Sequence, residues 1–139
     1  MDVGLALLAD YANVTAEGKL NIMGVFDVIY AHRFPTVHGQ MQLVFSLEAN
    51  PAEAGSTKQL EIKLMGEDGL TLFSLAGELS LQGKRPVPIG ELLKMNQIVG
   101  LQNVRFEKPG AYQIAILING DVKRTVSLRV QERPAQQQP

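Results

Sequence analysis

Two histidines, His32 and His38, are the side chains best suited to proton transfer or metal binding in this 139-residue sequence. They flank a segment that Pro35 keeps extended, so they could form a metal pair or a general acid and base. No serine, aspartate or glutamate nearby completes a catalytic triad, and no glutamate has the spacing of a helical metal site. Loop histidines that hydrogen-bond to backbone are the commoner case, so the sequence predicts no catalytic residue and no enzyme.

Carboxylates and amides are numerous enough to raise the question of a calcium site. The side chains concerned are Asp10, Asp27, Glu48, Asn50, Glu53, Glu67, Asp68, Glu78 and Asp121. Their spacing does not match a calcium-binding loop, and Glu67-Asp68-Gly69 has the composition of a tight turn. The sequence therefore predicts no metal and no cofactor. One alternative stays open, a ligand or metal site at one end of the molecule where His32, His38, Glu48 and Asn50 gather.

Composition removes several classes of function. The chain has no cysteine, which excludes thiol catalysis, iron–sulfur clusters and cysteine-based zinc sites. Thirteen basic residues against fourteen acidic ones give a net charge of −1, without the cationic surface of a nucleic-acid or anionic-membrane binder. The apolar run Val3–Ala9 is shorter than the ~20 residues of a membrane span, and no basic segment precedes it. We therefore expect a cytoplasmic protein that binds neither nucleic acid nor membrane.

Apolar and polar residues alternate along most of the chain, as in β-strands with one buried face. The segment 59–64 is the clearest case, and Asn119-Gly120 between two such segments predicts a tight hairpin. The pattern predicts about eight strands, at 3–13, 20–30, 40–49, 58–65, 70–81, 96–105, 111–118 and 122–130. Only Ile89–Lys94, which follows two prolines, is expected to be helical.

These elements predict an all-β fold, a two-sheet antiparallel β-sandwich with at most one short helix. A closed barrel is the alternative that the pattern leaves open. We expect one domain over residues 1–130. The segment 131–139 is rich in glutamine and proline and has no apolar anchor, so it is predicted to be a disordered tail.

Two segments resemble known proteins. The sequence from Phe106 to Tyr112 contains Pro-Gly-x-Tyr before the last hairpin and resembles the closing segment of immunoglobulin-like sandwiches. The resemblance implies that the Tyr112 hydroxyl binds nearby backbone and fixes a corner between sheets. The N-terminal part, Leu8–Val14 followed by Gly18–Asp27 and Pro35–His38, is similar to an uncharacterised bacterial family of small immunoglobulin-like β-sandwich proteins, a domain of unknown function. That similarity would cover residues 4–130 and implies a bacterial cytoplasmic setting, but it brings no activity, ligand or catalytic residue.

Some predicted strands are apolar on both faces, although the outer face of a two-layer sandwich should be polar. Loops of the chain itself, including the segment 83–95, or a second chain could cover such a surface. The sequence predicts one outward apolar surface made of five residues, Met23, Val25, Ile29, Ala115 and Leu117. It therefore favours a non-enzymatic module that binds another protein or itself, with loop-based ligand or metal binding as the alternative.

Overall fold

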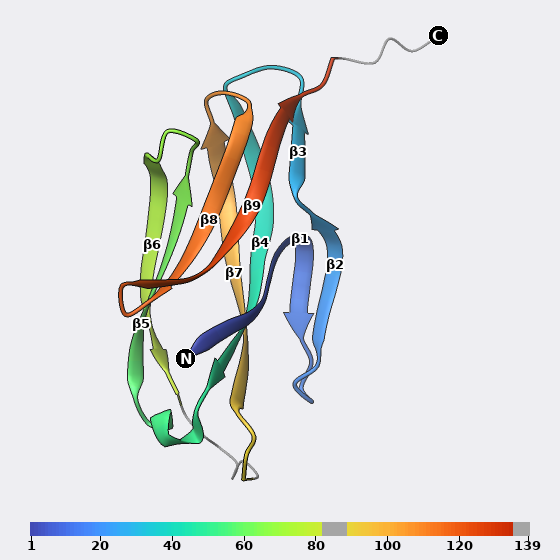
Figure 1. Ribbon diagram of the computed structural model, residues 1–139. Helices are drawn as coiled ribbons and strands as arrows, with labels where there is room; N and C mark the ends of the chain where they lie inside the picture. Colours follow the sequence, from blue (N-terminus) through green and yellow to red (C-terminus); the bar gives the residue numbers. More distant parts are fainter. Residues whose placement is uncertain (82–88, 135–139) are drawn as a thin grey trace.

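The computed structural model describes residues 1–81 and 89–134, which form two packed β-sheets. Nine strands occur in these ranges, and Figure 1 shows them: β1 (Asp2–Val14), β2 (Leu20–Phe26), β3 (Val28–Ala31), β4 (Thr36–Ala49), β5 (Thr57–Met65), β6 (Thr71–Ser80), β7 (Leu93–Phe106), β8 (Gly110–Ile118) and β9 (Asp121–Glu132). The first sheet has the order β2-β1-β4-β7, and the second has the order β3-β9-β8-β5-β6. The expectation of an all-β, two-sheet fold is confirmed.

The core lies between the two sheets and follows from the alternation in the sequence. On β5, Ile62 and Leu64 are buried, whereas Lys63 between them carries its charge outward and pairs with Glu61. Successive side chains of a strand point to opposite faces, so a period of two places one set in the core. Strand β4 contributes the inner row of the first sheet, Met41, Leu43, Phe45 and Leu47, all essentially inaccessible to solvent.

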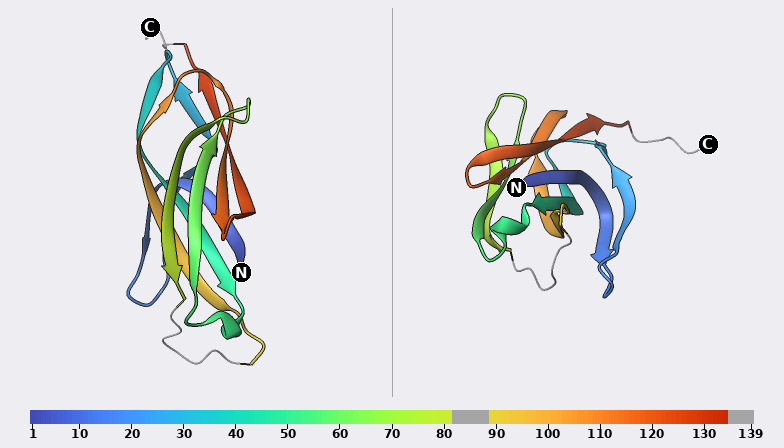
Figure 2. Two further views of the ribbon diagram at one scale, coloured as in Figure 1. Left: turned by 90° about the vertical axis from the view of Figure 1, so that its left-hand side faces the viewer. Right: turned by 60° about the horizontal axis from the view of Figure 1, so that its bottom comes forward.

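The prediction of a purely antiparallel sandwich of about eight strands is wrong in one place. The segment 20–30, expected as one strand, bends at Asp27 and divides into β2 in the first sheet and β3 in the second. After this crossing β3 runs parallel to β9, and the Arg129 amide donates a hydrogen bond to the Asp27 carbonyl at 2.8 Å. The views in Figure 2 show this passage from one layer to the other.

The short helix expected at Ile89–Lys94 is not formed. Ile89 and Gly90 make a turn, and Gly90 has a φ of +88°, which ends any right-handed helical turn. Leu93 and Lys94 already belong to β7 and pair with Ala49 and Glu48. Within the described ranges the helical structure is limited to one 3-10 turn, Pro51–Glu53. No helix in these ranges has the length and apolar character needed to cross a membrane.

The predicted domain boundary at residue 130 falls slightly too early. Strand β9 continues to Glu132, because Gln131 and Glu132 still pair with Tyr30 and Ala31 of β3. The remainder of the predicted tail includes residues 135–139, which lie outside the described residues. The same holds for residues 82–88, which include the first part, 83–88, of the 83–95 segment considered as a cover for an apolar surface.

The hairpin predicted at Asn119-Gly120 is confirmed. Both residues have positive φ angles, 50° and 83°, as the two central positions of a type I′ turn require. The Asn119 side chain also accepts a hydrogen bond from the Gln59 amide at 2.9 Å, and the Asn119 amide donates to the Gln59 carbonyl at 2.8 Å. The turn between β8 and β9 is thereby attached to β5.

Tyr112 forms the contact that the sequence implies. Its hydroxyl donates to the Lys108 carbonyl at 2.5 Å, while its ring is buried against Phe106 in an edge-to-face arrangement with centroids 5.0 Å apart. Burial raises the pKa of the Tyr112 hydroxyl, which keeps this group protonated and able to donate. One side chain therefore joins the β7–β8 turn to the core.

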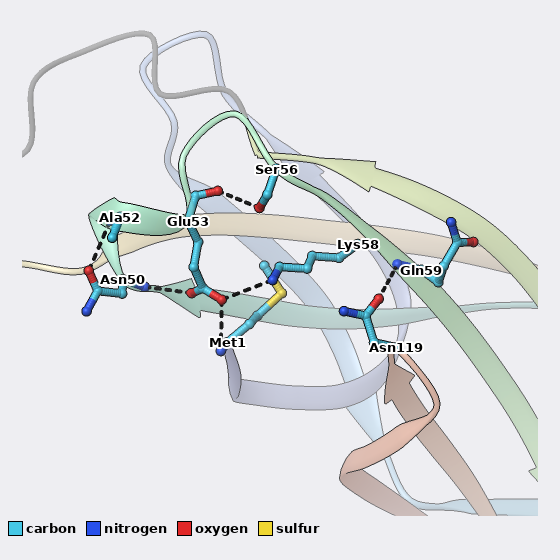
Figure 3. Close-up of polar contacts among 8 residues, drawn as sticks. All are labelled: Met1, Asn50, Ala52, Glu53, Ser56, Lys58, Gln59 and Asn119. Atoms are coloured by element: carbon cyan, nitrogen blue, oxygen red, sulfur yellow. Dashed lines mark hydrogen bonds and ion pairs between the residues drawn. The ribbon is translucent and has the colours of Figure 1, made fainter.

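Glu53 ties together the end of the sandwich where β4 passes into β5 (Figure 3). Its carboxylate lies 3.2 Å from the Lys58 ammonium and 3.6 Å from the Met1 amino group, and it accepts the Asn50 amide at 3.0 Å. The Asn50 side chain in turn accepts the Ala52 amide, which completes a capping box around the 3-10 turn. The hydrogen bond from Lys58, and next the one from the Asn50 backbone, hold the pKa of Glu53 below its ordinary value of 4.5.

Replacing Tyr112 tests its corner contact. We expect Tyr112→Phe to lower the free energy of unfolding by about 1 kcal/mol, since one hydrogen bond is lost while the packing is kept. Tyr112→Ala should cost about 3–5 kcal/mol through the cavity that it leaves. Urea unfolding measures both values, and equal stability of all three proteins would contradict the role assigned to Tyr112.

Acid should weaken the Glu53 cluster. A carboxylate with a lowered pKa contributes stability that is present above pH 4.5 and is lost as the pH falls through the lowered value. We expect Glu53→Gln to be less stable than wild type at neutral pH, and the difference to shrink on acidification. Glu17→Gln is the control, because Glu17 forms a largely exposed pair with Lys19. A Glu53→Gln difference independent of pH would contradict the assignment.

Candidate interaction surface

The outer face of the first sheet carries a continuous set of apolar side chains. The register places Tyr11 opposite Met23 and Ala9 opposite Val25 on the neighbouring strands β1 and β2. Residues directly opposite each other on antiparallel strands project to the same face, so these four side chains are neighbours. Met23 and Val25 are 65% and 61% exposed, and Tyr11 is 49% exposed.

The same face continues across β4 and β7. Leu7 lies opposite Val44, and Val44 lies opposite Ile98. Ala9 and Val44 are fully buried although neither belongs to the core between the sheets, because their apolar neighbours on this face cover them. We call these residues the apolar face: Leu7, Ala9, Tyr11, Met23, Val25, Val44 and Ile98.

The apolar face contains no charged residue and is bordered by amides. Gln42 lies beside Ala9 on the same face, and its side chain is engaged, since its oxygen accepts the Ala12 amide at 2.7 Å. Asn13 and Asn21 are joined by a hydrogen bond of 3.0 Å at the hairpin end of β1 and β2. An apolar centre with a polar border is the usual composition of a protein–protein interface.

The five residues predicted from the sequence do not share one surface. Met23 and Val25 lie together on the apolar face, whereas Ile29 is part of the core cluster on β3. The face predicted for Ile29 is wrong because the bend at Asp27 moves the chain into the other sheet, where the alternation starts anew. Ala115 and Leu117 lie on β8 of the second sheet.

Ala115 and Leu117 are buried, at 1% and 7% exposure, by residues of their own sheet. Ala115 lies between Lys63 and Thr125, whose side chains project to the same face. Leu117 is flanked in the same way on β5 and β9 by Glu61 and Val122. Cross-strand neighbours on β5 and β9 therefore flank both residues on this face of the second sheet.

Sequence reasoning missed Tyr11, Val44 and Ile98. A signal for Tyr11 was present, because it continues the alternation of Leu5, Leu7 and Ala9 along β1. Val44 and Ile98 could be found only from the register between β1, β4 and β7, which joins residues far apart in the chain.

The histidines and acidic residues considered as a metal or ligand site lie apart. The His32 ring nitrogen Nδ1 is 2.8 Å from the Arg133 carbonyl, and the His38 ring packs 5.9 Å from that of Phe26 with its Nε2 buried and unpartnered in the described structure. Glu48 is ten residues from His38 on the same strand, which is about 33 Å along an extended chain. In the described ranges no three His, Asp or Glu side chains are grouped as a metal site would require.

The turns at one end enclose a cavity of about 280 Å³. The β5–β6 and β7–β8 turns form it, and Leu70, Leu72, Pro109 and Tyr112 supply its apolar walls. Two of its carboxylates already accept backbone hydrogen bonds, Glu67 from the Ala111 amide at 2.6 Å and Asp68 from the Leu70 amide at 3.0 Å. The cavity does not include His32, His38, Glu48 or Asn50, the residues of the alternative ligand site, but it does include Glu67 and Asp68 from the acidic residues considered for calcium.

Comparison with solved structures gives a weak likeness. The chain is similar to the Pseudomonas fluorescens alkylpurine DNA glycosylase AlkC, solved bound to DNA containing an abasic site analog, with 13% sequence identity and a TM-score of 0.44. The match covers 91% of this chain but only 30% of that one, and at this TM-score it supports no inference about fold or function. No curated protein matches the sequence.

Comparison with protein families gives a match to nearly the whole folded unit. The matching model is that of DUF6941, described as a family of unknown function, and it spans residues 4–131. This range contains every strand of both sheets apart from the first residues of β1 and the last residue of β9. The chain belongs to the DUF6941 family of unknown function.

Proposed function

We propose that this protein is a non-enzymatic interaction module that binds a partner protein through the apolar face of its first sheet. The observation that carries the proposal is the exposure of Met23, Val25 and Tyr11 at adjacent positions on that face. Contiguous exposed apolar surface on a folded protein is characteristic of interaction sites. Methionine and tyrosine are also among the residues enriched in interface cores.

The chemistry of the face defines the partner. Its centre has no ionised side chain, so a partner with an apolar, uncharged contact surface would leave no buried charge unpaired. Tyr11 can pack its ring against such a surface while its hydroxyl stays at the polar border. The rigid strands beneath hold these side chains in place, which limits the entropy lost on binding.

The finer features of the setting are part of the same proposal. The edge-to-face packing of Tyr112 and its backbone hydrogen bond support an immunoglobulin-like sandwich, although the parallel β3–β9 pair departs from that pattern. A bacterial cytoplasmic location is compatible with the absence of cysteine.

One observation favours a second candidate function, binding of a small ligand by loops at one end. The 280 Å³ cavity beside Tyr112 combines apolar walls with Glu67, Asp68, Glu107 and Lys108 at its rim. That composition suits a small ligand with an apolar body and a polar group. Calorimetric titration with calcium, zinc and simple sugars, compared between wild type and Leu70→Arg, would reveal such binding.

Charges placed on the apolar face should abolish partner binding. We expect the double variant Met23→Glu/Val25→Glu to fold normally, because both side chains are largely exposed, and to bind its partner at least about a hundredfold more weakly. The reason is that a carboxylate buried in an apolar interface costs several kcal/mol. The measurement is quantitative affinity capture from native lysate, with a circular dichroism spectrum to verify folding.

Val122→Glu provides the matched control, since Val122 is an apolar residue of similar exposure, 58%, on β9 of the other sheet. Proteins that wild type and Val122→Glu retain, and that the double variant loses, would support the proposal. An identical set of proteins retained by all three would contradict it.

A further inference from the structure

The two sheets are left open along one side. Strand β6 is the last strand of the second sheet and β7 is the last of the first, and in the described structure neither has a partner on its outer edge. A cavity of about 380 Å³ lies between them, lined by residues 72–75 of β6 and residues 100–105 of β7. Figure 2, left, views the molecule from this side, with β6 toward the reader.

The open side exposes side chains that belong to the inner face of the second sheet. Leu75 lies opposite Ile62, a buried core residue, so it points inward, yet it is 42% exposed. Phe73, opposite buried Leu64, is also only partly covered. An inward-facing leucine with this exposure shows that the core is not closed at the edge of β6.

The edge of β6 has few of the features that keep other edges from pairing, and its one irregularity in register with β5 is a bulge at Leu72, near the start of the strand. Free strand edges are normally blocked by lysine, proline, a bulge or short length. Strand β3 has four residues, β2 contains Gly24 at a φ of +71°, and β7 is interrupted by Asn103 at a φ of +53°. Strand β6 has ten residues with no lysine, arginine or proline, and its only ionisable side chain is Glu78.

We propose that β6 pairs with β6 of a second copy of this chain, antiparallel and across a two-fold axis, so that the second sheets of the two molecules become one. Inward-facing residues stay inward only if residues of the same face lie opposite each other. Centring the pair on Leu75 satisfies this condition and unites the most exposed apolar part of the strand. Phe73 then lies opposite Gly77 of the partner subunit, and Ser74 opposite Ala76 of the partner subunit.

Charge and symmetry both favour a second copy as the occupant. In this register Glu78 lies opposite Leu72 of the partner subunit, so self-pairing brings no like charges together. A two-fold axis also makes the open sides of the two molecules face each other, which covers Leu75 and Phe73 in both copies at once. Two-fold pairing through one identical surface is the commonest form of homo-oligomer.

The register allows a sharp test with exposed residues of the outer face. Ser74 and Ala76 are exposed, and within one chain they lie beside Lys63 and Glu61 of β5. The variant Ser74→Lys/Ala76→Lys places two pairs of like charges across the dimer. The variant Ser74→Glu/Ala76→Lys places opposite charges across the dimer and next to Lys63 and Glu61, so it should also suit the folded chain.

Sedimentation equilibrium over a concentration series would measure the dimer dissociation constant. We expect wild type to show a monomer–dimer equilibrium. The dissociation constant should rise about tenfold in the double-lysine variant and fall about fivefold in the glutamate–lysine variant. The control, Gln113→Lys/Thr125→Lys, adds the same charges to exposed positions on the outer face of the same sheet, away from its edge, and should leave the constant unchanged. A wild type that stays monomeric up to its solubility limit would overturn the proposal.

The remaining outcomes also decide the matter. If the double-lysine variant fails to fold by circular dichroism, the glutamate–lysine variant alone must dimerise more tightly than wild type, and an unchanged constant counts against the pairing. Met23→Glu/Val25→Glu should leave the dimer intact, because its substitutions lie in the other sheet. Loss of the dimer in that variant would assign self-association to the apolar face and overturn pairing through β6.

Discussion

The crossing of the chain at Asp27 is the constraint on which the rest of this structure depends. On one side of it Phe26 pairs with Leu8 in the first sheet, and on the other Val28 pairs with Arg129 in the second. Because two residues of one continuous segment belong to different sheets, the layers are joined covalently at one side of the sandwich. At the bend the Asp27 carbonyl accepts a hydrogen bond from the Arg129 amide, so the backbone group at this corner between sheets has a partner.

The crossing also explains why the two sides of the molecule differ. One side is bridged by β2 and β3, whereas the other side ends in two separate edges, β6 and β7. Strands β6 and β7 belong to different sheets, so consecutive position in the chain does not pair them with each other. The opening lined by Leu75, Leu101 and Val104 is thus a consequence of strand order rather than of local sequence.

Features that depend on neighbouring residues, such as strand alternation and hairpin turns, were predicted from the sequence. The alternation through Leu60, Ile62 and Leu64 placed β5 and its buried face, and the positive φ that Asn119 and Gly120 tolerate placed a hairpin. The bend at Asp27 gave no such signal, because apolar residues continue on both sides of it and the choice of sheet depends on pairing with distant β9. For the same reason the sequence did not predict that Ile29 belongs to the core or that Ile98 belongs to the apolar face. The position of Ile98 on that face depends on its register with β4. A sequence shows which residues are apolar, but only strand pairing decides which of them share a face.

The two surfaces of this protein are separate, and that separation has a functional consequence if both proposals hold. Met23 and Val25 lie on β2, at one edge of the first sheet, and β6 lies at an edge of the second sheet on the open side. Pairing through β6 therefore leaves the apolar face of each copy free, and one dimer presents two identical faces. A partner that carries two contact sites would bind such a dimer with the second contact made intramolecularly, which raises the apparent affinity by about 10²–10⁴ when the spacing fits. A small apolar surface on each copy can then give a high apparent affinity for the partner without additional contacts on either copy.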